Sequence, residues 1–122
     1  MSDFLLSSIH YFRIPVVNLK ESIKWYSECL KLKMRFDKGE LAVFEVGTGP
    51  LLVLVEADKD SRGHFLKDGQ AEFSIGFTTS DIQSLHDYLV DQHVTVESIM
   101  EEEGHRFFYF YDLDGNKLQV HN

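Results

Sequence analysis

The sequence has little cysteine and little proline. Cys29 is the only cysteine among 122 residues, and only two prolines occur. A single cysteine excludes an intrachain disulfide and a cysteine-rich metal site. Because Cys29 lies beside the apolar stripe of a predicted helix, we interpret it as a small packing residue and not as a nucleophile. Pro15 lacks a backbone donor, so the strand that contains it is expected at a sheet edge or to end near it.

The sequence also lacks a long apolar run. No stretch approaches the length of a membrane span, and residues 1–8 lack the basic start and the long apolar region of a signal peptide. We therefore expect a soluble, cytoplasmic protein with no membrane partner.

Basic residues are in the minority. The chain has 12 Lys and Arg against 20 Asp and Glu, which gives a formal net charge of −8. An acidic surface repels phosphate backbones, so nucleic acid is not an expected partner. The run Glu101–Glu103 is interpreted as a solvated edge or loop.

Apolar residues make up 43% of the chain and include ten Phe, enough for the core of one compact domain.

The most informative local pattern is the C-terminal stretch from Phe107 to Asn122. Its aromatic residues alternate between the two faces of a strand at 106–111, and Leu118 and Val120 share one face of a strand at 117–121. Gly115 supplies the positive φ that the intervening turn needs. The stretch is predicted to be a hairpin.

Both halves of the chain show the same order of elements. The first half predicts a strand at 9–17, a helix capped by Asn18, and strands at 33–37, 41–46 and 51–56. The second half predicts a strand at 72–79, a helix capped by Ser80 or Asp81, and strands at 95–100, 106–111 and 117–121. The opening strands are expected to turn one face toward the helices, namely Phe12, Ile14 and Val16 in the first half and Phe73, Ile75 and Phe77 in the second.

This repeat predicts an α+β fold of two βαβββ modules within a single domain spanning 1–122. The modules cover about 9–56 and 72–122, and the polar stretch 57–71 links them. Four strands cannot close a barrel alone. Two such modules can bury one face of their curved mixed sheets against the helices and form a cleft with the other.

Two motifs resemble a known family. The opening RIPVVNLKESIKWY (13–26) and the closing FYFYDLDGNKLQV (108–120) are similar to the vicinal oxygen chelate superfamily. That superfamily includes glyoxalase I, bleomycin-resistance proteins, fosfomycin-resistance proteins and extradiol dioxygenases. The resemblance covers about 9–122. It implies the fold given above and a homodimer, with the cleft built within one chain or across subunits.

The resemblance also implies four metal-ligand positions, which fall on Tyr11, Val53, Ser74 and Gln119. Valine has no donor, serine and neutral tyrosine are poor ligands, and glutamine brings no charge to offset a desolvated cation. We therefore expect no metal and no cofactor. Two alternatives stay open: a register slip that turns His10 inward, and a partial site made of His121 and Glu45.

The cleft face is expected to be aromatic and aliphatic with a few polar groups, as in small-molecule sites. The predicted ligand-binding residues are Tyr11, Arg13, Val53, Ser74, Phe107, Tyr109, Gln119 and His121, with Leu41, Val43 and Val55 beside them. The tyrosines can stack on planar ligands, and Arg13 can bind a carboxylate or phosphate. Equally, Arg13 can pair with Glu45 or Glu56, and the aromatics can fill the cleft or face a partner subunit.

The expected function is metal-independent binding of a small hydrophobic or aromatic molecule, similar to that of the bleomycin-resistance proteins. The alternative is a metal-dependent, glyoxalase-like lyase, isomerase or thiol transferase with substituted ligands. A third possibility is a dimeric module without a ligand.

Overall fold

The first half of the chain folds as one sheet and one helix. In the computed structural model, which describes residues 5–122, these elements are β1 (Tyr11–Val16), α1 (Leu19–Glu28), β2 (Lys33–Asp37), β3 (Leu41–Glu45) and β4 (Leu51–Glu56). The strand order is β1-β4-β3-β2, with β1 and β4 parallel and the other pairs antiparallel. Strand β1 is thus an edge strand, which confirms the expectation for the strand that contains Pro15.

The second half repeats this plan with shorter strands. Its elements are β7 (Gly76–Thr78), α2 (Ile82–Asp91), β8 (Thr95–Val96), β9 (Met100–Glu102), β10 (His105–Tyr111) and β11 (Lys117–His121). The order is β7-β11-β10-β8, and β9 also pairs with β10. The predicted α+β fold of two βαβββ units is confirmed. The single strand predicted at 95–100 is divided into β8 and β9, which pair with different parts of β10.

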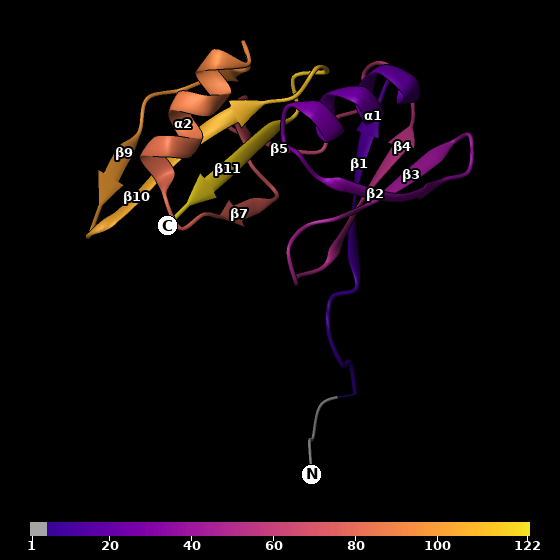
Figure 1. The fold of residues 1–122 in the computed structure, drawn as a ribbon, viewed down its shortest axis with the longest axis horizontal. Coiled ribbons are helices and arrows are strands. Elements are labelled where there is room, and N and C mark those ends of the chain that lie inside the picture. Colours follow the sequence, from indigo (N-terminus) through magenta and orange to yellow (C-terminus); the bar gives the residue numbers. More distant parts are fainter. Residues whose placement is uncertain (1–4) are drawn as a thin grey trace.

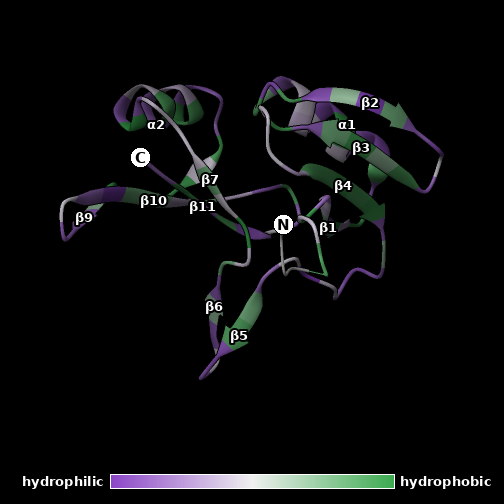
Figure 2. Ribbon diagram, turned by 90° about the horizontal axis from the view of Figure 1, so that it is seen from below, coloured by the Kyte–Doolittle hydropathy of each residue, from purple (hydrophilic) through white to green (hydrophobic). Residues whose placement is uncertain are grey.

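The connection between the halves contains a hairpin that the sequence pattern did not predict. Strands β5 (Phe65–Lys67) and β6 (Gln70–Glu72) pair around Asp68 and Gly69, both of which have positive φ. That two-residue Asp-Gly turn is a strong hairpin signal. The hairpin extends away from both sheets (Figure 2). The strand predicted at 72–79 was wrong, because its first residue belongs to this hairpin and only residues 76–78 join the sheet.

Helix capping follows the sequence closely. The Asn18 side chain accepts a hydrogen bond from the backbone N–H of Glu21 at 3.1 Å, as predicted. Asp81, one of the two candidates, caps α2 by accepting from the N–H of Ser84 at 3.1 Å. These side chains satisfy backbone donors that the first turn leaves free.

In the described residues no helix is long and apolar enough to cross a membrane.

The two halves share one hydrophobic core. Both views show the sheets side by side rather than stacked face to face, each with its own helix (Figures 1 and 2). The Tyr88 hydroxyl of α2 donates to the carbonyl of Glu28 in α1 at 3.0 Å, so the helices meet. The largest fully buried side chains come from both halves: Tyr26, Phe44, Phe108, Ile14, Leu54, Ile82, Leu89, Leu118, Val16 and Val120. Phe12 departs from its predicted burial. It is 38% exposed near the start of β1.

A buried polar network joins the turn between β10 and β11 to the first half. Asn116 is 0% exposed, donates to the carbonyl of Pro15 at 2.9 Å and accepts from the N–H of Gly63 at 2.7 Å. The buried carboxylate of Asp112 accepts from the Tyr26 hydroxyl at 2.6 Å and from the Asn116 amide at 2.8 Å. Burial and the nearby carboxylate raise the pKa of Tyr26 well above its usual value, so its hydroxyl remains a donor.

Substitution Asn116→Ala should lower the free energy of unfolding by about 2–3 kcal/mol, because buried groups left without a partner each cost roughly 1–3 kcal/mol. Urea denaturation measures the change. Asn122→Ala is the control, since Asn122 is exposed and, within residues 5–122, its side chain accepts a single hydrogen bond, from the N–H of Arg106 at 3.3 Å. Equal destabilisation by the two variants would contradict the role given to the network.

Candidate functional site

The first sheet carries a hollow on the face that is turned away from α1, here called the N-terminal face. The hollow has a volume of about 570 Å³. Its lining residues are His10, Tyr11, Arg13, Arg35, Phe36, Lys38, Leu41, Val43, Leu51 and Val53. The predicted site residues Tyr11, Arg13 and Val53 are therefore brought together here.

Strand alternation explains the make-up of this hollow. Val43 and Val53 pair across β3 and β4 and are each 6% exposed, so they form an apolar floor. Tyr11 and Phe36 are 51% and 44% exposed and present their rings to solvent. Phe36 reaches this face because β2 has an irregular register between Met34 and Phe36. The hollow thus offers apolar contact and ring stacking at one place.

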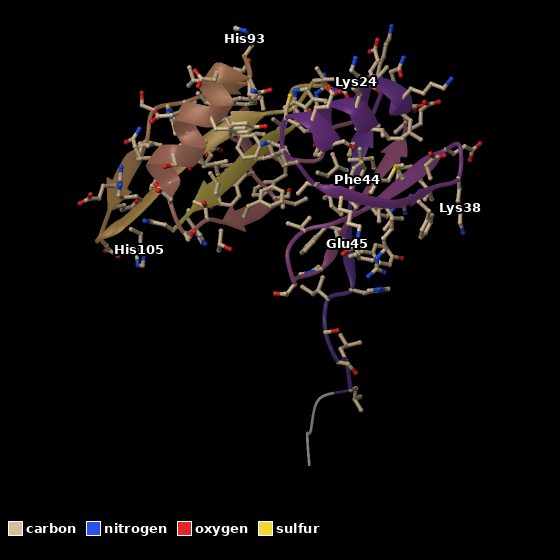
Figure 3. All side chains as sticks on the ribbon, viewed as in Figure 1. Lys24, Lys38, Phe44, Glu45, His93 and His105 are labelled. Carbon is tan, nitrogen blue, oxygen red and sulfur yellow. The ribbon has the colours of Figure 1, made fainter. Side chains whose placement is uncertain are left out.

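Positive charge surrounds this floor. Arg13 lies beside Val53 in the β1–β4 ladder, and the Lys38 ammonium lies 5.5 Å from the centre of the Phe36 ring. The Arg35 Nε lies 3.4 Å from a carboxylate oxygen of Glu45, with both side chains substantially exposed. Figure 3 shows Lys38 and Glu45 on the first half of the molecule, whereas Lys24 projects from α1 at the top of the view.

The second sheet has an open face of its own, here called the C-terminal face, which is turned away from α2. Four predicted residues lie there, because Tyr109 pairs with Gln119 and Phe107 pairs with His121. The Tyr109 ring lies 5.7 Å from the Phe107 ring and 5.8 Å from the Phe73 ring, measured between centroids. This face therefore carries an aromatic cluster centred on Tyr109.

Charged groups surround Tyr109. The Lys117 ammonium lies 4.2 Å from its ring centroid and donates to the carbonyl of Ala71 at 3.1 Å, which ties the β5–β6 hairpin to the sheet. Burial raises the pKa of Tyr109, and the charges of Glu72, Glu97 and Glu102 raise it further.

Two neighbouring groups have their protonation state set by local contacts. The Tyr111 hydroxyl donates to Glu97, and burial together with that carboxylate raises the pKa of Tyr111 to about 12. The N–H of Lys117 donates to Nδ1 of His64 at 2.9 Å. Burial, followed by the charges of Arg62 and Lys117, lowers the pKa of His64, so the ring is neutral with its proton on Nε2.

Ser74 does not take the place that the sequence pattern predicted. It lies in a bend between β6 and β7, outside any strand. The predicted face of Phe73 was also wrong. Its ring packs on Tyr109 at the open face, whereas the Phe77 ring lies 6.2 Å from Phe110 in the core. Because the β5–β6 hairpin interrupts the strand, the alternation between Phe73 and Phe77 is lost. The half-buried Phe73, rather than Ser74, therefore contacts Tyr109 on this face.

The predicted site residues lie on two separate faces. The hollow on the N-terminal face has no lining residue from the second half of the chain. A different hollow, of about 480 Å³, lies between the halves and is lined by residues 46–52, residues 75–78 and Phe12. None of the eight predicted site residues lines it. Within one chain the two faces therefore do not form a single cleft, which was one of the two arrangements that the sequence left open.

The family metal positions do not fit a divalent ion. Tyr11 and Val53 lie on the N-terminal face and Gln119 on the C-terminal face, and these residues supply no carboxylate or imidazole. Throughout residues 5–122, no group of three or more His, Cys, Asp or Glu side chains is placed to hold a metal. The alternative partner Glu45 already has its carboxylate beside the Arg35 guanidinium.

Several residues of these faces were missed by the sequence pattern: Arg35, Phe36, Lys38 and Leu51 on the first, and Glu72, Phe73 and Lys117 on the second. His10 lines the first face without the register slip that was considered for it, because Ile14 and Val16 remain buried. The irregular register of β2 leaves no visible mark in the sequence. The Asp68–Gly69 turn was a usable signal, because an Asp-Gly pair between two short runs predicts the hairpin that places Phe73.

Comparisons with known proteins agree with this fold. Metallothiol transferase FosB of Staphylococcus saprophyticus is 24% identical over 119 residues, which is 96% of this chain and 78% of FosB. The structure of TnmS3, an antibiotic binding protein from Streptomyces sp. CB03234, is similar with 20% identity and a TM-score of 0.78, covering 96% of each chain. Lactoylglutathione lyase from Agrobacterium tumefaciens is similar with 19% identity and a TM-score of 0.74, covering 97% of this chain and 95% of that one.

At these identities the structural neighbours show the fold alone. The family model for the Glyoxalase/Bleomycin resistance protein/Dioxygenase superfamily matches residues 8–120, which is nearly the whole chain. The chain belongs to the Glyoxalase/Bleomycin resistance protein/Dioxygenase superfamily.

Proposed function

We propose that this protein binds a small hydrophobic or aromatic molecule without using a metal ion. The hollow on the N-terminal face carries the proposal: it has a buried aliphatic floor, two exposed aromatic rings and a volume of about 570 Å³. Ligand pockets commonly have volumes of about 300–1,000 Å³ and this mixture of side chains. The similarity to TnmS3, an antibiotic binding protein, supports a binding role.

The proposal includes a homodimer that completes the site. Because the two open faces do not meet within one chain, a shared cleft requires the N-terminal face of one copy to lie against the C-terminal face of another. Charge supports this pairing. The N-terminal face carries Arg13, Arg35 and Lys38 against one carboxylate, Glu45. On the C-terminal face, Glu72, Glu97 and Glu102 surround Tyr109 against one ammonium, Lys117, so the two faces have opposite net charge.

The proposed ligand-binding set is the one expected from the sequence, with one exchange. Tyr11, Arg13 and Val53 come from one face, and Phe107, Tyr109, Gln119 and His121 come from the other. Phe73 takes the place of Ser74. The proposal treats residues 1–122 as one domain with modules at 9–56 and 72–122, and the cytoplasmic location stays a prediction.

Planar aromatic compounds should raise the melting temperature, because a ligand that binds the folded state stabilises it. A panel of charged and neutral compounds, including 2-naphthol and 2-naphthamide, tests this in a thermal-shift assay. Tyr11→Ala should weaken the affinity about tenfold, which corresponds to about 1.4 kcal/mol of lost contact. Val90→Ala, which removes an exposed apolar side chain from α2, should leave the affinity unchanged. A panel without any stabilising compound would contradict the proposal.

Protein purified without an affinity tag or a chelator should contain far less than one divalent metal per chain. The reason is the donor set at the family positions, which offers no charge to offset a desolvated cation. Elemental analysis for zinc, nickel, manganese and iron measures the content. Stoichiometric metal would contradict the proposal and favour a metal-dependent enzyme. The similarity to metallothiol transferase FosB is the observation that supports this alternative.

The protein should sediment as a dimer, and Glu102→Lys should shift it toward the monomer. Glu102 pairs with His105 and so shares the C-terminal face with Phe107 and Tyr109. A lysine there would meet the cations of the other face. Glu101→Lys changes the net charge equally but lies on the opposite side of β9, so it should leave the dimer intact. Sedimentation velocity that shows wild-type monomer at all concentrations would refute the two-copy site.

A further inference from the structure

We infer that the hollow on the N-terminal face takes a ligand in which an anionic group is attached to a planar apolar body. This inference rests on the proposed function and specifies its ligand. Three observations carry it: the sign of the charge around the hollow, the positions of the cations, and the apolar floor beneath them.

The charge around this hollow is opposite to that of the chain. The whole sequence has 20 acidic and 12 basic residues, but Arg13, Arg35 and Lys38 line the hollow, and among residues 5–122 no Asp or Glu lines it. His10 adds a fourth group that can be protonated. In an acidic protein such a concentration of cations makes a local attractive field for an anion.

The cations are not equivalent. Arg35 lies beside the Glu45 carboxylate at 3.4 Å, so part of its charge is balanced by the protein. Arg13 projects from the middle of β1 at the level of Val53. A guanidinium offers two parallel N–H donors, which suit the two oxygens of a carboxylate or phosphate. Arg13 is therefore assigned the main contact with the anion and Lys38 a supporting charge.

The apolar floor and the exposed aromatic rings favour a planar apolar body for the remainder of the ligand. Val43 and Val53 are almost completely buried, so an anion held above them lies close to a low-dielectric surface, where its attraction to Arg13 is stronger than in open water. Tyr11 and Phe36 expose their rings on the same hollow. A planar aromatic body can stack on these rings while its charged group reaches Arg13.

The test compares ligands that differ in charge and share a ring system. Binding of 2-naphthoate, 2-naphthyl phosphate and neutral 2-naphthamide is measured by isothermal titration calorimetry at about 0.05 and 0.5 M NaCl. At least one anion should bind tenfold or more tightly than the amide at low salt, and high salt should reduce that preference. The stronger of the two anions then distinguishes a carboxylate from a phosphate ligand.

Variants locate the contact. Arg13→Gln should remove the preference for the anion over 2-naphthamide, and Lys38→Gln should reduce this preference partly. Lys24→Gln is the matched control, because it removes one positive charge from α1, away from the hollow (Figure 3). Sedimentation of each variant verifies that its oligomeric state is that of the wild type.

The outcomes separate this inference from the proposed function. If the amide and both anions bind equally, or if Arg13→Gln and Lys24→Gln act alike, the anionic ligand class is wrong while aromatic binding stands. If no naphthalene compound binds and the wider aromatic panel also fails to stabilise the protein, both are wrong.

Discussion

The relative position of the two halves depends on the buried hydrogen bonds of Asp112 and Asn116. One turn of the second half places a carboxylate against the Tyr26 hydroxyl of α1 and an amide against the carbonyl of Pro15 in β1. Apolar packing is non-directional and would tolerate small rotations of one half against the other. Buried polar groups must find their partners, so they select one arrangement.

That arrangement determines which surfaces remain open. With Ile14 and Phe108 turned into a common core, alternation along the same strands directs Arg13 and Tyr109 outward, on two sheets that lie side by side. In the proposed function, each open face is half of a site. The first supplies an aliphatic floor and cations, and the second supplies an aromatic cluster among carboxylates. The homodimer belongs to the proposal for this reason, because neither face encloses a ligand alone.

Much of this was predictable because strand alternation is a local property. The period of two along 106–111 and 117–121 correctly assigned Phe108 to the core and Tyr109 to the open face. The prediction failed at 72–79 because residue 72 pairs with β5 and does not begin a strand of the second sheet. Phe73 therefore contacts Tyr109 on the open face, where Ser74 was predicted. The relative orientation of the sheets was not predictable, because it depends on contacts such as that between Tyr26 and Asp112, which are 86 positions apart.

The positive charge of the hollow on the N-terminal face was also not predictable from the sequence. The chain is acidic, and counting alone gives no reason to expect a cationic hollow. Arg13, Arg35 and Lys38 gather only because the parallel β1–β4 pair and the β2–β3 hairpin place their strands in one sheet. A divalent ion bound by carboxylates and imidazoles would place positive charge in a cleft. In the proposed site, guanidinium and ammonium groups supply this positive charge, and they require no coordinating carboxylates or imidazoles. In the proposed site, Tyr11 and Val53 supply no carboxylate, and Arg13, Arg35 and Lys38 beside them supply positive charge without a metal ion.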